Sequence, residues 1–183
     1  MKAEMVVNLS ELPSMETAGR DVCPSQASVV IHGNGRRDGA DDGVIGASEM
    51  VWGFSNPVRK GLIINARAET AREKVTFADS IARRRCVIPA SGFYEWSHDE
   101  KKTKYLFTVG GEKLIYLCGI YKIVDGRHRF AILTRVANAT MIETHNRMPI
   151  IIRKEHVRTY LTDAAAAIRL IGNASPILMR EAV

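Results

Sequence analysis

The 183-residue sequence is poor in cysteine and has no long hydrophobic run. Its three cysteines, Cys23, Cys86 and Cys118, are widely spaced and form no Cys-x-x-Cys pair, which argues against a zinc knuckle and a disulfide scaffold. No uncharged apolar stretch reaches the ~18 residues that a membrane-spanning helix needs. The first residues, Met1-Lys2-Ala3-Glu4, lack the apolar run of a secretory signal. We therefore expect a soluble cytoplasmic protein with no membrane partner.

Several well-known catalytic signatures are also absent. The sequence contains no G-x-S-x-G nucleophile elbow, no Walker loop and no H-E-x-x-H zinc motif, and its glycines near residues 33–46 do not form G-x-G-x-x-G after a strand. The five histidines are scattered, and none stands at ligand spacing from a carboxylate or a thiol. We therefore expect neither a metal ion nor a cofactor.

The composition is that of one globular domain with a positive charge. Hydrophobic residues make up 46% and charged residues 25%, both near the average of globular proteins. Lysine and arginine number 26 against 20 acidic residues, which gives a net charge of +6. Clustered cations favour a polyanionic partner because they release counterions from phosphates. A basic but otherwise unspecialised surface explains the same charge, so both interpretations stay open.

Short apolar segments separated by turn residues predict a sheet of antiparallel strands. The connections include the glycine pair Gly110-Gly111 and the dipeptide Asp125-Gly126, which is typical of tight hairpins. Short strands joined in this way predict a meander rather than alternating strands and helices. The expected strands cover residues 29–31, 50–54, 62–64, 86–89, 92–96, 105–109, 114–121 and 129–134.

One segment between the strands changes to helical spacing. Apolar residues recur at spacings of four, three and four at Ala71, Val75, Ala78 and Ala82. Thr70 and Glu73 have the form of a capping box, which would satisfy free backbone N–H groups at a helix start. The pattern predicts one helix over residues 70–84.

The carboxyl-terminal part of the chain is also expected to be helical. Residues 154–161 and 163–171 have helical patterns, and Gly172 is suited to end the second helix in a left-handed conformation. No repeat and no long linker divides the chain. We expect a single α+β domain over residues 1–183, with a curved, mainly antiparallel, barrel-like β-sheet and peripheral helices.

Three short segments carry polar residues beside apolar strands, at 65–70, 91–96 and 144–149. Asn65 offers an amide, Glu95 a carboxylate between aromatic residues, and His145 an imidazole. Desolvation by aromatic rings raises the pKa of a carboxylate, which can then act as a general acid or base near neutral pH. The alternatives are that Asn65 ends a strand, that Glu95 pairs with an arginine, and that His145 is an ordinary loop histidine.

Longer runs around these residues resemble the SRAP family, the SOS-response-associated peptidase domain. The resemblance covers roughly residues 20 to 180, and Cys23-Pro24-Ser25-Gln26 is similar to the family's early Ala-Pro-Thr-Gln turn. The runs that carry it are Trp52-Gly53-Phe54, Asn65-Ala66-Arg67-Ala68-Glu69-Thr70, Ser91-Gly92-Phe93-Tyr94-Glu95-Trp96 and His145-Asn146-Arg147-Met148-Pro149.

The resemblance implies a function in DNA repair. Members of the family recognise abasic sites in single-stranded DNA and cross-link covalently to the aldehyde of the opened deoxyribose. Their nucleophile is a cysteine at position 2, whose amine and thiol close a thiazolidine on the sugar carbon. The resemblance therefore implies abasic single-stranded DNA as the partner, a location at the nucleoid, and action as a monomer.

The resemblance also implies a role for individual residues. Asn65 would hold the nucleophile and the sugar, Glu95 would be the acid–base carboxylate, and His145 would be a second proton-transfer group. The residues expected to bind DNA are Arg67 and Arg147, which would contact phosphates, and Pro24, Trp52 and Met148, which would shape the groove where the DNA bends and bases stack.

The sequence departs from the family pattern at its start. The family begins Met-Cys-Gly-Arg, whereas this chain has lysine at position 2 and no cysteine before Cys23. We expect that the amino-terminal segment is truncated or divergent and that cross-linking needs the cysteine restored. The alternatives are a module that binds single-stranded DNA without chemistry, a substitute nucleophile (the α-amino group or Cys23), and a thiol autopeptidase. Cys23 also fits a plain structural role where the family has alanine.

Overall fold

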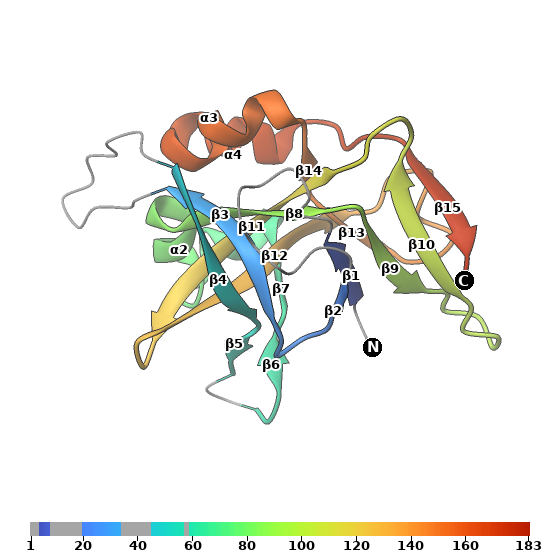
Figure 1. Ribbon diagram of the computed structural model, residues 1–183, viewed down its shortest axis with the longest axis horizontal. Coiled ribbons are helices and arrows are strands. Elements are labelled where there is room, and N and C mark those ends of the chain that lie inside the picture. Colours follow the sequence, from blue (N-terminus) through green and yellow to red (C-terminus); the bar gives the residue numbers. More distant parts are fainter. Residues whose placement is uncertain (1–3, 8–19, 34–44, 57–58) are drawn as a thin grey trace.

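The computed structural model describes residues 4–7, 20–33, 45–56 and 59–183, with the first of these described by backbone alone (Figure 1). Five strands pair around a closed ring. Within this ring, only β12 and β4 run parallel, and the other neighbours are antiparallel. The expected curved, barrel-like and mainly antiparallel sheet is therefore confirmed. The ring strands are β3 (Ala27–Gly33), β4 (Ile45–Trp52), β8 (Arg85–Ala90), β11 (Ile115–Val124) and β12 (Arg127–Val136).

A second, antiparallel sheet lies beside the ring, at the right of Figure 1. Because β8 and β9 belong to different sheets, the simple meander expected from the sequence is wrong at this point. Gly92 begins β9 where a Cβ atom would lie 2.6 Å from the carbonyl oxygen of Phe107, so only glycine permits this close approach. In spatial order, the strands are β15 (Leu178–Ala182), β10 (Lys104–Val109), β9 (Gly92–Trp96), β1 (Glu4–Val7) and β2 (Arg20–Val22).

Short strands extend the ring and bring the polar segments to β12. Both β7 (Asn65–Arg67) and β13 (Arg147–Pro149) pair with the second half of β12, the first in parallel and the second antiparallel. A further strand, β14 (Ile151–Ile152), pairs with β11. The small hairpin of β5 (Phe54–Ser55) and β6 (Leu62–Ile63) leads the chain from β4 into β7.

The Asp125-Gly126 dipeptide forms the hairpin turn that the sequence predicts. It joins β11 to β12, with Val124 opposite Arg127, and its two residues have φ angles of 50° and 73°. Positive φ at both central positions is the type I′ geometry, which matches the right-handed twist of the flanking strands. This local sequence therefore sets the register between the two longest strands of the ring.

The single helix predicted over residues 70–84 is wrong. The segment forms two short helices, α1 (Ala68–Ala71) and α2 (Ala78–Arg83), with a turn between them. Val75, expected on the apolar face, is 96% exposed, whereas Phe77 is buried against Phe54. The β-branched pair Val75-Thr76 weakens the helix, and burial of Phe77 is gained only if the chain turns there.

The proposed capping box is also wrong. Thr70 lies inside α1, and its buried hydroxyl has no hydrogen-bond partner among the described residues. The backbone carbonyl of Thr70 instead accepts from the N–H groups of Glu73 and Lys74 at the start of the turn. The Thr70 and Glu73 side chains therefore do not define a helix start.

The carboxyl-terminal helices are confirmed. They are a 3₁₀ turn, η1 (Lys154–His156), followed by α3 (Val157–Thr162) and α4 (Ala164–Gly172), and the last two lie together at the top of Figure 1. Gly172 is the last helical residue, and Asn173 after it is extended, so the expected left-handed stop is wrong. In the part of the chain that the structure describes, no helix is long and apolar enough to cross a membrane.

Two apolar clusters occupy the ring and the space beneath the helices, and each contains a cysteine. Cys86 belongs to the first cluster and Cys118 to the second, and both are fully buried. Burial raises the pKa of both thiols. The prediction that these cysteines are small buried hydrophobic residues is therefore confirmed, and both are unreactive at neutral pH.

Arg85 connects the helices to the ring. Its side chain is 6% exposed and donates to carbonyl oxygens at the ends of two helices. Nε and Nη2 donate to Tyr160 and Leu161 of α3 at 2.7 Å and 3.0 Å, and Nη1 donates to Ile81 and Ala82 of α2 at 3.1 Å and 2.5 Å. Helix carboxyl ends carry partial negative charge, so one guanidinium satisfies both.

We expect the substitution Arg85→Met to lower the free energy of unfolding by about 2 to 4 kcal/mol, because it leaves buried carbonyl groups without donors. Urea unfolding followed by circular dichroism measures this loss. Arg83→Met is the matched control, since Arg83 is 58% exposed and makes only a surface ion pair with Asp79; it should change stability by less than about 0.5 kcal/mol. Equal losses in the two variants would contradict the role of Arg85.

Candidate functional site

A pocket of about 310 Å³ opens between the ring and the second sheet. This volume is at the lower end of the ~300–1,000 Å³ typical of small-molecule sites. Residues from β4, β7, β9, β11, β12 and β13 line it, so it forms only when both sheets are in place. The lining residues are Trp52, Asn65, Arg67, Phe93, Tyr94, Glu95, Leu117, Ile132, Thr134, His145, Asn146, Arg147, Met148 and Pro149.

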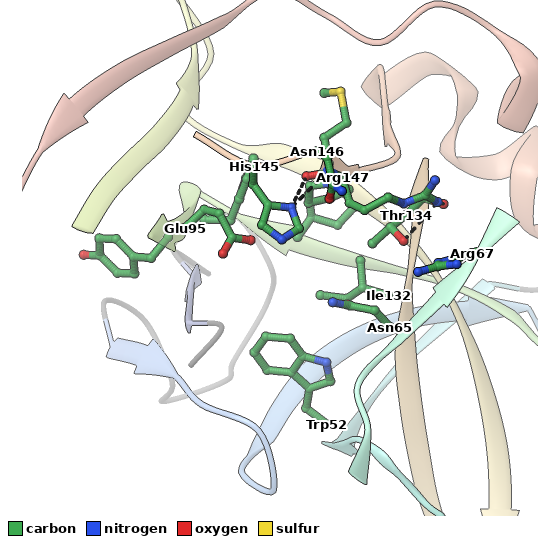
Figure 2. Close-up of a pocket in the computed structure, with 14 residues that line it drawn as sticks. Trp52, Asn65, Arg67, Glu95, Ile132, Thr134, His145, Asn146 and Arg147 are labelled. Carbon is green, nitrogen blue, oxygen red and sulfur yellow. Dashed lines mark hydrogen bonds between the residues drawn. The ribbon is translucent and has the colours of Figure 1, made fainter. Parts of the chain in front are cut away.

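The structure brings together the three residues that the sequence analysis singled out for catalysis. Asn65 comes from β7, Glu95 from β9, and His145 from the segment before β13, and all three line the pocket. Figure 2 shows the Glu95 carboxylate directed toward the His145 ring, with Asn65 across the pocket from them. The arrangement places an acid, an imidazole and an amide around one small space.

Glu95 has the environment of a proton-transfer carboxylate. Burial is the largest influence on the pKa of Glu95 and raises it. The weaker influences that lower the pKa include the positive charge of His145, a hydrogen bond from the Trp96 backbone N–H at 3.3 Å, and the positive charge of His98. The net shift of the pKa is upward. The raised pKa predicted from the aromatic neighbours is confirmed. Among the described residues no arginine forms an ion pair with Glu95, which removes the simplest structural explanation for this carboxylate.

His145 is held in one tautomer by the backbone. Its side chain is 8% exposed, and the backbone N–H of Arg147 donates to Nδ1 at 2.9 Å. A nitrogen that accepts a hydrogen bond carries no proton, so in the neutral ring the proton lies on Nε2. Nε2 faces the pocket in Figure 2, where it can donate to a bound molecule. Protonated Nδ1 could instead donate to the Arg147 carbonyl oxygen, which is 3.1 Å away.

Asn65 is positioned through the residue before it. The carbonyl oxygen of Ile64 accepts from Trp52 Nε1 and from the backbone N–H of Ile132, both at 3.0 Å. Asn65 then begins β7 opposite Ile132, which corrects the expectation that it follows a strand. Its amide is partly exposed in the pocket and forms no side-chain hydrogen bond with the described residues.

The two arginines differ in what their guanidinium groups contact. Arg67 is exposed and makes no hydrogen bond or ion pair with the described residues. Arg147 donates to both carboxylate oxygens of Glu69, at 2.8 Å and 2.7 Å, and to the Thr134 carbonyl oxygen at 2.7 Å. Its Nε is buried and has no described partner. Arg67 is therefore free to bind a phosphate, whereas Arg147 has most of its donors engaged.

The residues expected to shape the groove lie in different environments. Trp52 and Met148 line the pocket, but each is only 1% exposed, so they form its floor and offer no open face for stacking. Pro24 does not line the pocket and lies in the turn between β2 and β3. Cys23 beside it is partly exposed and is not among the residues that line the pocket.

Sequence reasoning missed Glu69, Thr134 and His98 as neighbours of the site. Glu69 lies inside the Asn65–Thr70 segment that the sequence analysis singled out. Its ion pair with Arg147 joins residues 78 positions apart, and no local sequence pattern predicts such a contact. The ring of His98 stacks on that of His145 with centroids 4.6 Å apart. The described residues contain no cluster of three or more histidine, cysteine or acidic side chains that could hold a metal ion.

We expect the Glu69–Arg147 pair to stabilise the fold in a pH-dependent way. The Arg147 hydrogen bonds lower the pKa of Glu69 to about 2, so the contribution is complete above its unfolded pKa of ~4.3 and disappears as pH falls through 2. Glu69→Gln should cost about 1 kcal/mol at pH 7, because the carboxylate is partly exposed and screened. Urea unfolding at successive pH values measures the difference.

The matched control is Glu73→Gln, which changes an exposed carboxylate in the neighbouring turn. It should leave stability unchanged at every pH, and the wild-type and Glu69→Gln curves should converge toward pH 2. If Glu69→Gln and Glu73→Gln behave alike at pH 7, the ion pair contributes nothing measurable.

Known proteins resemble this chain in sequence and in fold. It is 31% identical over 153 residues to the abasic site processing protein YoaM of Bacillus subtilis, a match that covers 77% of this chain and 64% of YoaM. It is 27% identical over 119 residues to the abasic site processing protein YedK of Escherichia coli, covering 61% of this chain and 53% of YedK. The chain thus spans somewhat less than two thirds of the length of YoaM.

The fold is shared with solved structures. A phage-related protein of Bordetella bronchiseptica has a TM-score of 0.76 at 21% identity, with 100% of this chain and 93% of that chain covered. A second protein of that organism has a TM-score of 0.79 at 21% identity, with coverage of 100% and 99%. The family described as SOS response associated peptidase (SRAP) matches residues 4–177. The chain belongs to the SRAP family.

Proposed function

We propose that this protein recognises abasic sites in single-stranded DNA and that the opened sugar occupies the pocket between Glu95, His145 and Asn65. The observation that carries the proposal is that these three side chains meet in one pocket of a chain whose relatives are named abasic site processing proteins. The pocket has room for an opened deoxyribose. The exposed guanidinium of Arg67 at its edge suits a neighbouring phosphate.

The proton-transfer groups match the chemistry of an aldehyde. Opening of the deoxyribose ring transfers a proton from the C1 hydroxyl and delivers one to the ring oxygen, which requires a base and an acid on the same small molecule. Burial raises the pKa of Glu95 above its usual value, which favours a part in proton transfer. His145 presents Nε2–H to the same space, and Asn65 can hydrogen-bond the sugar or the attacking group.

Covalent attachment would need a nucleophile that this sequence lacks at position 2. In the cross-linking reaction the amine of an amino-terminal cysteine attacks the aldehyde carbon, the carbonyl oxygen leaves as water, and the thiol adds to the resulting imine carbon. The sequence has lysine at position 2. We therefore propose reversible binding by the chain with this sequence and cross-linking by a form that carries Met-Cys-Gly-Arg at its start.

The test uses two fluorescent single-stranded oligonucleotides that differ only in one abasic site. Fluorescence anisotropy should show at least tenfold tighter binding to the abasic strand, equivalent to about 1.4 kcal/mol. A denaturing gel should show an adduct only with the Met-Cys-Gly-Arg form. Equal affinity for the two strands, together with no adduct from either form, would contradict the proposal.

A second candidate is a module that binds single-stranded DNA without regard to damage. The net charge of +6 favours it. It predicts strongly salt-dependent binding that is equal for the intact and the abasic strand, and no adduct in either form. The same two experiments therefore separate the candidates.

Arg67 provides a second prediction. If it binds one phosphate, Arg67→Gln should weaken binding equally for the intact and the abasic strand and reduce the slope of log K against log salt by about 1. Arg72→Gln is the matched control, because Arg72 is an exposed arginine at the end of α1 and does not line the pocket. An unchanged salt slope in Arg67→Gln would show that Arg67 contacts no phosphate.

A further inference from the structure

His98 contacts the site from the loop between β9 and β10. Its ring stacks on His145 with centroids 4.6 Å apart and an angle of 29° between the ring planes. His145 is almost completely buried, so its second face and its Nδ1 edge are covered by the protein, and His98 covers the remaining face. The ring of His145 therefore has little freedom to rotate.

The loop that carries His98 is fixed on both sides of it. Ser97 before it donates from its backbone N–H to the Thr103 carbonyl at 2.9 Å, and its hydroxyl accepts from the Thr103 N–H at 2.9 Å. Asp99 after it accepts from the Ser97 hydroxyl at 2.6 Å and from the Lys102 N–H at 3.0 Å. This network holds His98 beside His145, although the side chain of His98 is itself exposed.

We propose that His98 is a positioning residue of the site, which holds the His145 ring with Nε2 toward the pocket. This role of His98 rests on the proposed function only where it concerns reaction with DNA. Stacking fixes the direction in which Nε2–H of His145 points, so the ring is already oriented for reaction when a molecule binds. Positive charge on His98 also acts on the buried Glu95 carboxylate.

The effect on Glu95 has a definite sign. Burial raises the pKa of Glu95, and positive charge on His98 is among the influences that lower it. Removing His98 therefore favours the protonated form of Glu95. Other charged groups also lie near the two imidazoles. On the side of His145 they are Arg147, which is paired with Glu69, Arg67 at the pocket edge, and Arg180, which donates to Thr144 and lies close to Glu143. In the loop of His98 they are Asp99, Lys101 and Lys102.

Two variants separate stacking from charge. His98→Phe keeps an aromatic ring over His145 and removes the charge, whereas His98→Ala removes both. His156→Ala is the matched control, because His156 is exposed on η1 and does not line the pocket. The measurements are made on the free protein by NMR: the pH titration of the Glu95 side-chain carboxyl carbon, and the ring-current shifts of the His145 ring protons.

In both His98 variants the Glu95 midpoint should rise above the wild-type midpoint, because the positive charge that lowers it is removed. The His145 ring-current shifts should persist in His98→Phe and disappear in His98→Ala, and His156→Ala should change neither quantity. The inference is overturned if His98→Ala leaves both the Glu95 midpoint and the His145 shifts at their wild-type values.

A reaction measurement then links the inference to function. With the Met-Cys-Gly-Arg form, the initial rate of adduct formation with abasic DNA is measured from pH 5 to 8. His98→Phe should move the pH profile without lowering its maximum, and His98→Ala should do both. If neither the parent nor the variants form an adduct, the proposed function fails. The role of His98 is then decided by the NMR measurements on the free protein alone. An unmoved profile in His98→Phe, with normal adduct formation, would contradict the effect of its charge.

Discussion

Strand β12 is the element on which the rest of the structure depends, because four strands pair with it. It closes the ring by pairing in parallel with β4, and it continues the hairpin from β11 on its other edge. Beyond the point where β4 ends, its second half pairs with β7 and β13. Trp52, Asn65 and Arg147 therefore reach one pocket through strands that pair with β12, whereas Glu95 and its neighbours Phe93 and Tyr94 come from the second sheet.

Two glutamates of the site illustrate how environment alone decides the behaviour of one side-chain type. Glu69 meets the guanidinium of Arg147 in a bidentate contact, which lowers its pKa to about 2 and keeps it charged as a structural anchor. Glu95 is buried without an arginine partner among the described residues, and burial raises its pKa. Glu69 fixes the position of Arg147 in the wall of the pocket, whereas Glu95 has an environment suited to proton transfer.

Local patterns predicted the fold class well where the physical cause was local. Asp125-Gly126 specifies its hairpin because both residues tolerate positive φ, and the strands on either side follow from apolar runs that are buried over five consecutive residues each. The helix expected over residues 70–84 failed for the opposite reason. Its apolar spacing was real, but Phe77 finds its contacts in the tertiary core beside Phe54, and this contact competes with helix continuation. Gly172 likewise ends its helix without the left-handed turn.

The sequence by itself determined the chemistry that is available: an amide, a carboxylate among aromatic residues, an imidazole and several arginines, in runs that resemble the SRAP family. Only the tertiary structure decided how these groups are used. It engaged Arg147 with Glu69 and left Arg67 exposed, it buried Trp52 and Met148 in the pocket floor, and it placed His98 on His145. Side-chain identity fixes what a group can donate or accept, whereas charge state and contacts depend on partners distant in sequence that meet only when the sheets close.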